Sequence, residues 1–373
     1  MQPVGFVRRF RFWSVLTVIS IYLLILVGGV VRASGSGMGC PDWPKCFGQW
    51  VPPTDIKQLP ANYKQVYLAQ RVRKNQKLAR TLASMGFKEV AGEIFAHPTQ
   101  YVETEFNATK TWIEYVNRLV GALIGVFVFV TAVVALPYWR RDRPVFWLAV
   151  GGWLLTGVQG WLGSLVVSTN LLPIMVTIHM GLALLIVAML LYAADRARQE
   201  PTQAALLGSE WLEQPQKAIN STYNSQSIFT LLWLLLLATF VQIILGTQVR
   251  EQVDHLSAAA DYAGRENWVS QLGSVFKVHR SFSLLIALLN GYAAYKLWPL
   301  MGRVRQLTGA VLILVGLEIV AGIVLAYLAL PAVVQPIHLT LATLLFGAQF
   351  LTLLAYHRAV ISSQKPRLRP AHA

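Results

Sequence analysis

Eight long apolar segments constrain this chain more than any other feature of its sequence. They run approximately over residues 12–31, 116–137, 145–167, 174–194, 228–249, 279–299, 307–330 and 334–356. A helix of about 20 residues crosses the hydrocarbon core of a bilayer and satisfies its own backbone hydrogen bonds there. The chain is 55% hydrophobic and only 13% charged. We therefore predict an all-α membrane protein with eight transmembrane helices, and not a soluble or disordered chain.

Basic residues between the apolar segments predict the orientation of the chain. The formal net charge is +15, and clusters of Arg lie within residues 8–11 and 140–143. Because short cytoplasmic loops are enriched in Lys and Arg, both termini and the even-numbered connections are predicted to be cytoplasmic. The same pattern argues against nucleic-acid binding as the reason for the charge. Residues 32–112 then form a long extracytoplasmic loop after the first helix, and long loops translocate largely regardless of their charge.

One helix is predicted inside this long loop. Residues 63–84 contain neither Gly nor Pro and are followed by Gly86 as a stop signal. The basic residues on this helix include Arg71, Arg73, Lys74, Lys77 and Arg80. A basic helix of this kind can lie near anionic lipid head groups. It can also dock a partner protein, and the sequence leaves both interpretations open.

The second half of the chain repeats the design of the first. Corresponding residues at the outer ends of the spans are Asn117 and His279, Arg118 and Arg280, and His179 and His338. The separation within each half is also similar, from position 117 to 179 in the first half and from 279 to 338 in the second. We predict two pseudo-symmetric four-helix bundles, residues 1–194 and 228–373, joined by a cytoplasmic linker over residues 195–227.

Three histidines are predicted to share one depth near the outer surface of the membrane. Intramembrane ionisable residues are costly and usually mark a site, although a single histidine can also serve only as an interhelical hydrogen-bond donor. No Cys or carboxylate lies at helical spacing from His279 or His338, which argues against zinc. Two facing imidazoles with little else polar nearby suit the axial positions of haem iron in a four-helix bundle. His179 has the corresponding place in the first half.

Small and basic residues next to these positions agree with a flat ligand. The small residues that follow the four positions are Gly121, Gly125, Gly181, Ala183, Ser281, Ser283, Thr340 and Ala342. Such residues let a haem slide between helices, but they also permit close helix packing. Arg118 and Arg280 are each one residue beyond a ligand position. A guanidinium there can clamp a haem propionate or, equally, a lipid phosphate.

The segment after the first apolar span resembles the haem A synthase family. Residues 28–48 read GGVVRASGSGMGCPDWPKCFG. Glu114, three residues before Asn117, the QGWLG run at 159–163 and the two Pro-then-His pairs fit the same family. The resemblance covers essentially all eight apolar segments.

The resemblance implies an oxidoreductase acting on a CH or CH2 group. In the family, the C8 methyl group of haem O is oxidised to the formyl group of haem A by successive hydroxylations with water as the oxygen source. A haem b cofactor is implied in the C-terminal half, with His279 and His338 as iron ligands and Arg280 beside them. The substrate haem is implied in the N-terminal half, with His179 on its iron and Glu114 as the essential acid.

Asn117 departs from the family pattern, which has a histidine at this position. An amide is a poor ligand for haem iron. The substrate iron would then be held by His179 alone, with Asn117 donating a hydrogen bond to a water in the sixth position or to the macrocycle edge. Alternatively, this half binds haem differently or has lost activity.

The acid is also asymmetric, because Phe276 occupies the position in the second half that Glu114 occupies in the first. A bis-histidine iron has no open position and suits an electron carrier, so we expect electrons to leave the substrate haem through haem b. Glu114 can accept a proton or stabilise positive charge at the oxidised carbon. The alternative for Glu114 is a salt bridge to Lys110 or Arg118, which lie at helical spacing.

Cys40 and Cys46 are six residues apart in a Gly- and Pro-rich loop on the oxidising side, and they match the family's pair in the outside loop. We expect a local disulfide. Its role is open between simple stability, holding the loop over the substrate site, and accepting electrons.

Two other functions compete with the synthase. A two-site membrane cytochrome would only transfer electrons and would not need the loop around Cys40 and Cys46. A haem transporter would need a path across the membrane, whereas the candidate ligands share one depth. We expect a bacterial inner-membrane location, with the haem sites towards the outer side. By resemblance, the partners are haem O, lipid, a haem O synthase and oxidase assembly factors, with no nucleic acid; a homo-oligomer is left open.

Overall fold

The chain is helical, as the apolar segments predict. The computed structural model describes residues 5–96, 105–197, 225–260 and 263–364. Within these ranges there is no β-strand, and Cys46 and Gln49 form an isolated β-bridge. The all-α class is therefore confirmed. Most of the predicted linker at 195–227 lies outside the described residues, so the division into 1–194 and 228–373 stays a prediction.

Eight long helices correspond to the eight apolar segments. They are α1 (Gly5–Ala33), α4 (Ala108–Val134), α6 (Arg143–Ser168), α7 (Pro173–Ala197), α10 (Ser225–Ala259), α12 (Ser274–Leu297), α13 (Arg303–Tyr327) and α14 (Val334–Gln364). Seven of them are individually long and apolar enough to cross a membrane. Helix α12 passes this test only together with Arg265–Gln271, from which it is bent by 82°. These helices make the chain a multi-pass membrane protein.

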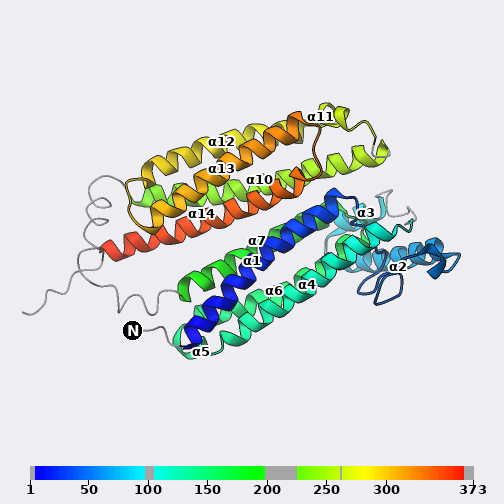
Figure 1. Ribbon diagram of the computed structural model, residues 1–373, viewed down its shortest axis with the longest axis horizontal. Helices are drawn as coiled ribbons and strands as arrows, with labels where there is room; N and C mark the ends of the chain where they lie inside the picture. Colours follow the sequence, from blue (N-terminus) through cyan, green and yellow to red (C-terminus); the bar gives the residue numbers. More distant parts are fainter. Residues whose placement is uncertain (1–4, 97–104, 198–224, 261–262, 365–373) are drawn as a thin grey trace, which may run out of the picture.

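The long helices lie in two neighbouring groups with nearly parallel axes (Figure 1). One group holds α1, α4, α6 and α7, and the other holds α10, α12, α13 and α14. Helices α1 and α7 pack against α14, and α7 also packs against α10. Leu184 of α7 shares a buried cluster with Leu232 of α10 and Leu353 of α14, so the core continues from one group into the other.

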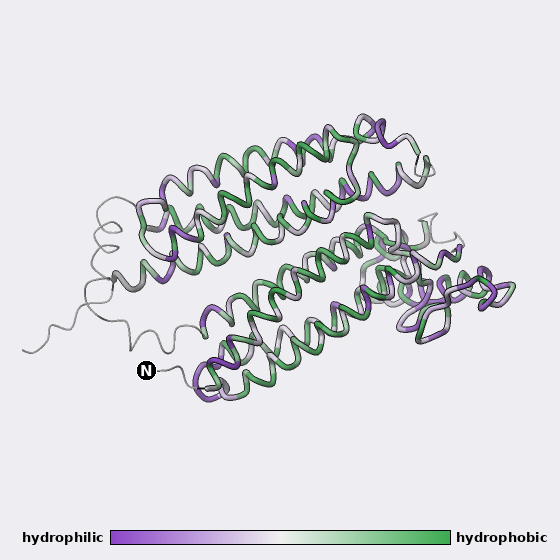
Figure 2. Tube along the Cα trace, viewed as in Figure 1, coloured by the Kyte–Doolittle hydropathy of each residue, from purple (hydrophilic) through white to green (hydrophobic). Residues whose placement is uncertain are grey.

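Apolar residues cover the lengths of the helices, and polar residues gather at their ends (Figure 2). Many large apolar side chains on the outer faces are exposed, among them Leu123, Phe129, Leu288, Ile313 and Val320. A soluble monomer rarely exposes such a continuous apolar surface. Lipid is the environment that this surface fits.

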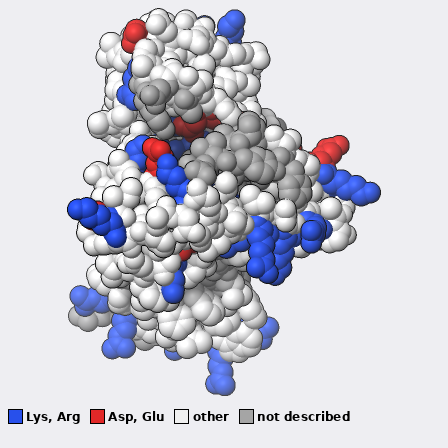
Figure 3. All heavy atoms as spheres, turned by 90° about the vertical axis from the view of Figure 1, so that its right-hand side faces the viewer, with Lys and Arg blue, Asp and Glu red and all other residues white. Residues whose placement is uncertain are grey.

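The segment between α1 and α4 carries its own helices, η1 (Ile56–Gln58), α2 (Tyr63–Ser84) and α3 (Lys88–Ala96). The helix predicted at residues 63–84 is thus confirmed, and Gly86 follows it with a φ of +94°, a conformation that favours glycine. The amide of Asn75 in α2 donates a 2.9 Å hydrogen bond to the carbonyl oxygen of Ser168, at the end of α6. Figure 3 views the end of the molecule that carries α2, where Lys and Arg outnumber Asp and Glu on the surface.

Two clusters of ion pairs join the helix groups near opposite ends. Asp254 of α10 pairs with Arg32 of α1 at 2.8 Å and with Arg250 at 2.6 Å. Asp195 of α7, whose side chain is only 3% exposed, pairs with Arg303 of α13 and Arg358 of α14.

Further short helices are α5 (Tyr138–Arg141), η3 (Arg265–Asn267) and α11 (Trp268–Gln271).

Candidate functional site

The two histidines of the second helix group face each other across the interior of that group. His279 lies on α12 and His338 on α14, with ring centroids 6.4 Å apart and ring planes at 83°. Two imidazole–metal bonds of about 2.0–2.1 Å span roughly 4 Å, so this separation has room for one metal ion between the rings. The Nδ1 atoms of both rings are buried and make no hydrogen bond.

Glycines on the neighbouring helices accommodate these two rings. A Cβ atom added to Gly246 of α10 would lie 3.3 Å from Cε1 of His279, and one added to Gly322 of α13 would lie 3.9 Å from Cε1 of His338. The amide of Gln242 donates a 3.0 Å hydrogen bond to the carbonyl oxygen of His279. A ring separation of 6.4 Å and a buried Nδ1 of His279 without a hydrogen bond fit two ligands of a haem iron.

A carboxyl group next to His338 was missed from the sequence. Oε2 of Glu318, on α13, lies 3.0 Å from Nδ1 of His338. The expectation that little else polar lies near the histidine pair is therefore wrong. Sequence reasoning considered only carboxylates on the same helix as each histidine, whereas Glu318 reaches His338 from the adjacent helix. The signal that points to Glu318 is the repeat, because Gln159 precedes His179 by the same interval as Glu318 precedes His338.

His179 in the first helix group has similar surroundings. A Cβ atom at Gly163 of α6 would lie 3.6 Å from Cε1 of His179, and the amide of Gln159 donates a 3.0 Å hydrogen bond to the His179 carbonyl oxygen. The Nδ1 atom of His179 is buried and makes no hydrogen bond. Asn117 on α4 is partly buried, and its Oδ1 atom is also buried without a hydrogen bond. Each of these two side chains therefore has a buried polar atom without a hydrogen-bond partner.

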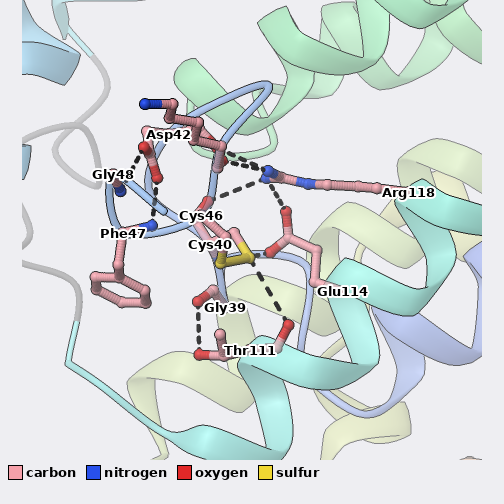
Figure 4. Close-up of a disulfide and its surroundings, with 10 residues drawn as sticks. Gly39, Cys40, Asp42, Cys46, Phe47, Gly48, Thr111, Glu114 and Arg118 are labelled. Atoms are coloured by element: carbon pink, nitrogen blue, oxygen red, sulfur yellow. Dashed lines mark hydrogen bonds and ion pairs between the residues drawn. A yellow bond between two sulfur atoms is a disulfide. The ribbon is translucent and has the colours of Figure 1, made fainter. Parts of the chain in front are cut away.

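Glu114 is buried where α4 meets the loop after α1 (Figure 4). Its side chain is 4% exposed. Oε2 accepts a 2.8 Å hydrogen bond from the backbone N–H of Cys40, and Oε1 pairs with the Arg118 guanidinium one helical turn later. Of the two salt bridges considered from the sequence, the structure has the one to Arg118.

Arg118 is bound to the loop as well as to Glu114. Its guanidinium donates to the carbonyl oxygens of Asp42 at 2.7 Å and of Lys45 at 3.0 Å. The Arg118 guanidinium, which from the sequence can bind a haem propionate or a lipid phosphate, is thus hydrogen-bonded to the loop. Arg280, the corresponding residue of the second half, is exposed, and its guanidinium carbon lies 5.9 Å from the centre of the Phe276 ring. The two arginines therefore differ in what they contact.

The loop itself is tightly folded against the start of α4. Cys40 and Cys46 form the expected disulfide, and both residues are fully buried. The Thr111 hydroxyl donates a 2.8 Å hydrogen bond to the carbonyl oxygen of Gly39. A Cβ atom at Gly39 would come within 2.6 Å of the Lys110 carbonyl carbon, so only glycine fits this close approach.

Taken together, the fold and the site define a multi-pass, all-helical membrane protein with partly buried histidines in two helix groups and a disulfide-closed loop beside a buried glutamate. Residues 11–90 and 83–350 match the family model described as cytochrome oxidase assembly protein. The chain belongs to this family, and the resemblance seen in the loop sequence is confirmed.

The chain is also similar to proteins named "Heme A synthase". The one from Shewanella oneidensis is 25% identical over 261 residues, which are 69% of this chain and 62% of that protein. The one from Nitrosomonas eutropha is 27% identical over 191 residues, 49% of this chain and 46% of that protein. The one from Rhizobium leguminosarum bv. trifolii is 27% identical over 167 residues, 44% of this chain and 38% of that protein. This chain thus spans less than two thirds of the length of each relative.

Proposed function

We propose that this protein is a haem A synthase, which oxidises the C8 methyl group of haem O to the formyl group of haem A. The overall change converts a methyl group and one water into a formyl group, four protons and four electrons. The observation that carries the proposal is the difference between the halves. One has a facing pair of partly buried histidines, and the other has one histidine, an asparagine and a buried glutamate.

The C-terminal half is the proposed haem b site. His279 and His338 would hold the haem iron, and Arg280, exposed at the outer end of α12, would bind a propionate. When bound there, haem b supplies one-electron transfer from the substrate site to an acceptor outside the protein. With two histidines as ligands of its iron, this haem would have no open position for a substrate oxygen.

The N-terminal half is the proposed substrate site. His179 would bind the iron of haem O on one side. Asn117 would face the other side, where its amide donates a hydrogen bond to a water or to the macrocycle edge. The unpartnered Oδ1 of Asn117 supports a water or ligand at this position, because a buried acceptor is costly without a donor.

Glu114 is the proposed proton acceptor of the oxidation. Arg118 stabilises its negative charge, and the Cys40 N–H fixes the orientation of its carboxylate. The loop after α1 covers Glu114. The disulfide would hold this loop in place, and accepting electrons from the substrate site remains a second role for it.

We further propose that the protein spans a bacterial inner membrane with both termini in the cytoplasm and both haem sites towards the outer side. The Arg-rich segments at residues 8–11 and 140–143 support this orientation. A haem O synthase would supply the substrate, and cytochrome oxidase assembly would use the product.

Haem A production with and without Glu114 tests the proposal. The chain is produced in cells that make haem O but lack their own haem A synthase, and the total haems are separated by chromatography. Wild-type protein should yield haem A. Glu114→Ala should lower the yield at least a hundredfold, the effect of losing a general base, while the haem of the C-terminal half is retained.

Glu105→Ala is the matched control, because Glu105 is an exposed glutamate of the same loop region, paired with Lys64. It should leave the haem A yield unchanged. The competing function is a two-site cytochrome, favoured by the amide at Asn117. No haem A from the wild-type protein, with haem b still bound, would support the cytochrome and refute the synthase.

A further inference from the structure

Glu318 is a buried carboxyl group that the proposed function does not use. It lies on α13 within an apolar span, and its side chain is 16% exposed. Placing an ionisable side chain within a membrane span costs free energy, and such side chains are usually paired with another polar group. Among the described residues, the one ion-pair partner found for Glu318 is His338.

The geometry of this pair selects one nitrogen of the His338 ring. Oε2 of Glu318 is 3.0 Å from Nδ1, while Oε1 and Nδ1 make no hydrogen bond. Oε2 of Glu318 and Nδ1 of His338 are close enough for a hydrogen bond, but the angles at these atoms lie outside the range of one. When Nε2 of an imidazole binds a metal, Nδ1 carries the proton and needs an acceptor. A carboxyl oxygen can supply that acceptor.

Gln159, which corresponds to Glu318 in the first half, makes a different contact. Gln159, Gly163 and His179 follow one another at the same intervals as Glu318, Gly322 and His338. Gln159 donates its amide hydrogen to the backbone carbonyl of His179. A carboxylate has no hydrogen to donate there, and Glu318 contacts the His338 ring instead of its backbone. Of these two corresponding pairs, only Glu318 and His338 make a carboxyl–imidazole contact.

We propose that Glu318 is a positioning residue for the haem of the C-terminal half, accepting the Nδ1–H of His338 and so fixing the ring with Nε2 towards the iron. The inference rests on the proposed function, because it presumes that His279 and His338 bind haem. A hydrogen bond from Nδ1–H to a carboxyl oxygen makes the imidazole a stronger electron donor, which favours ferric over ferrous iron. Glu318 therefore lowers the reduction potential of this haem.

Redox titration of the purified full-length protein tests this role. The signal to be followed is the low-spin haem absorption that His338→Ala abolishes. Glu318→Gln preserves the shape of the side chain and reproduces the residue found at position 159. It should raise the ratio of ferrous to ferric haem at a fixed potential about tenfold, equivalent to about 59 mV for one electron. Glu318→Leu removes the acceptor altogether and should shift the potential in the same direction and at least as far.

Gln159→Leu is the matched control, since it alters the corresponding position of the other helix group and should leave this potential unchanged. If the His338-dependent potential is the same in wild-type, Glu318→Gln and Glu318→Leu proteins, the inference is overturned and Glu318 has only a packing role. If the wild-type protein shows no haem signal that depends on His338, the haem site of the proposed function fails instead. The two failures are therefore distinguishable.

Discussion

Single residues distinguish the two halves of this protein. Asn117 stands where His279 stands in the second half, and Glu114 stands where Phe276 stands. The Oδ1 atom of Asn117 is buried without a hydrogen bond, which is a costly arrangement unless a ligand or water completes it. The chemistry of the proposed substrate site therefore depends on an amide that binds iron poorly.

Restoring a histidine at position 117 should convert the substrate site into a second bis-histidine site. Asn117→His adds an imidazole opposite His179, so bound haem O should become six-coordinate and low-spin. The dissociation constant of haem O should fall about tenfold, which corresponds to about 1.4 kcal/mol of binding free energy. Electron paramagnetic resonance and haem titration measure these changes. Asn117→Gln, which keeps the amide, should cause neither; an unchanged spectrum in Asn117→His would show that position 117 does not face the iron.

Gly39 should be irreplaceable in the loop over Glu114. A Cβ atom there overlaps the backbone of α4, so Gly39→Ala should push the loop away and destabilise it by about 1–3 kcal/mol, the cost of overpacking. Limited proteolysis of the loop and thermal unfolding in detergent measure this effect. Gly92→Ala provides the comparison, because nothing lies within 4 Å of a Cβ atom there. Equal protease resistance in both variants would contradict the close approach.

Whole helices follow the sequence closely where local signals are strong. The helix over residues 63–84 was predicted from the lack of Gly and Pro and from Gly86, and α2 has these bounds. The membrane helices extend beyond their apolar segments, since α10 continues to Ala259 and α14 to Gln364. Hydropathy detects the part of a helix that contacts lipid and not its polar ends. The bend before α12 was not predicted.

Helix α2 should depend on Asn75 for its attachment to α6. The Asn75 amide satisfies the carbonyl of Ser168 in a buried position, so Asn75→Ala should cost about 1–3 kcal/mol and loosen α2. Hydrogen–deuterium exchange should rise across residues 63–84 and stay constant in α13. Gln76→Ala, at an exposed position of the same helix, is the control. Unchanged exchange in Asn75→Ala would mean that apolar contacts alone hold α2.

The site itself was predicted only in part, for a physical reason. The histidines and Asn117 stand out because polar residues are rare in apolar spans, whereas Glu114 and the cysteine pair stand out through the family resemblance. The contact between Glu318 and His338 depends on how α13 packs against α14, and in the sequence only the comparison with Gln159 and His179 in the first half points to it. The engagement of Arg118 by the loop carbonyls was missed for the same reason.

At the scale of the whole molecule, the two helix groups are joined by the ion-pair clusters at Asp195 and Asp254. Asp195 is buried and pairs with arginines from two helices of the other group. Removing one member of a buried pair leaves the remaining charges uncompensated. The relative placement of the two proposed haem sites therefore depends on these clusters.

Asp195→Asn should destabilise the protein by about 3 kcal/mol, the cost of breaking a buried ion pair. Thermal unfolding in detergent measures the change. Asp142→Asn removes a more exposed pair with Arg196 inside the first group, and it should cost less than about 1 kcal/mol. If Asp195→Asn loses no more stability than Asp142→Asn, the ion pairs of Asp195 do not hold the two helix groups together.

The most direct test of the two-site account is the haem content of the purified protein. The wild-type chain is isolated from cells that also make haem O, and its non-covalently bound haems are extracted and separated by chromatography. Two haem sites of the proposed kind should yield haem b together with haem O, its hydroxylated form or haem A. Haem b alone would contradict the substrate site at His179 and Asn117, and the absence of any haem would contradict the assignment of His279 and His338.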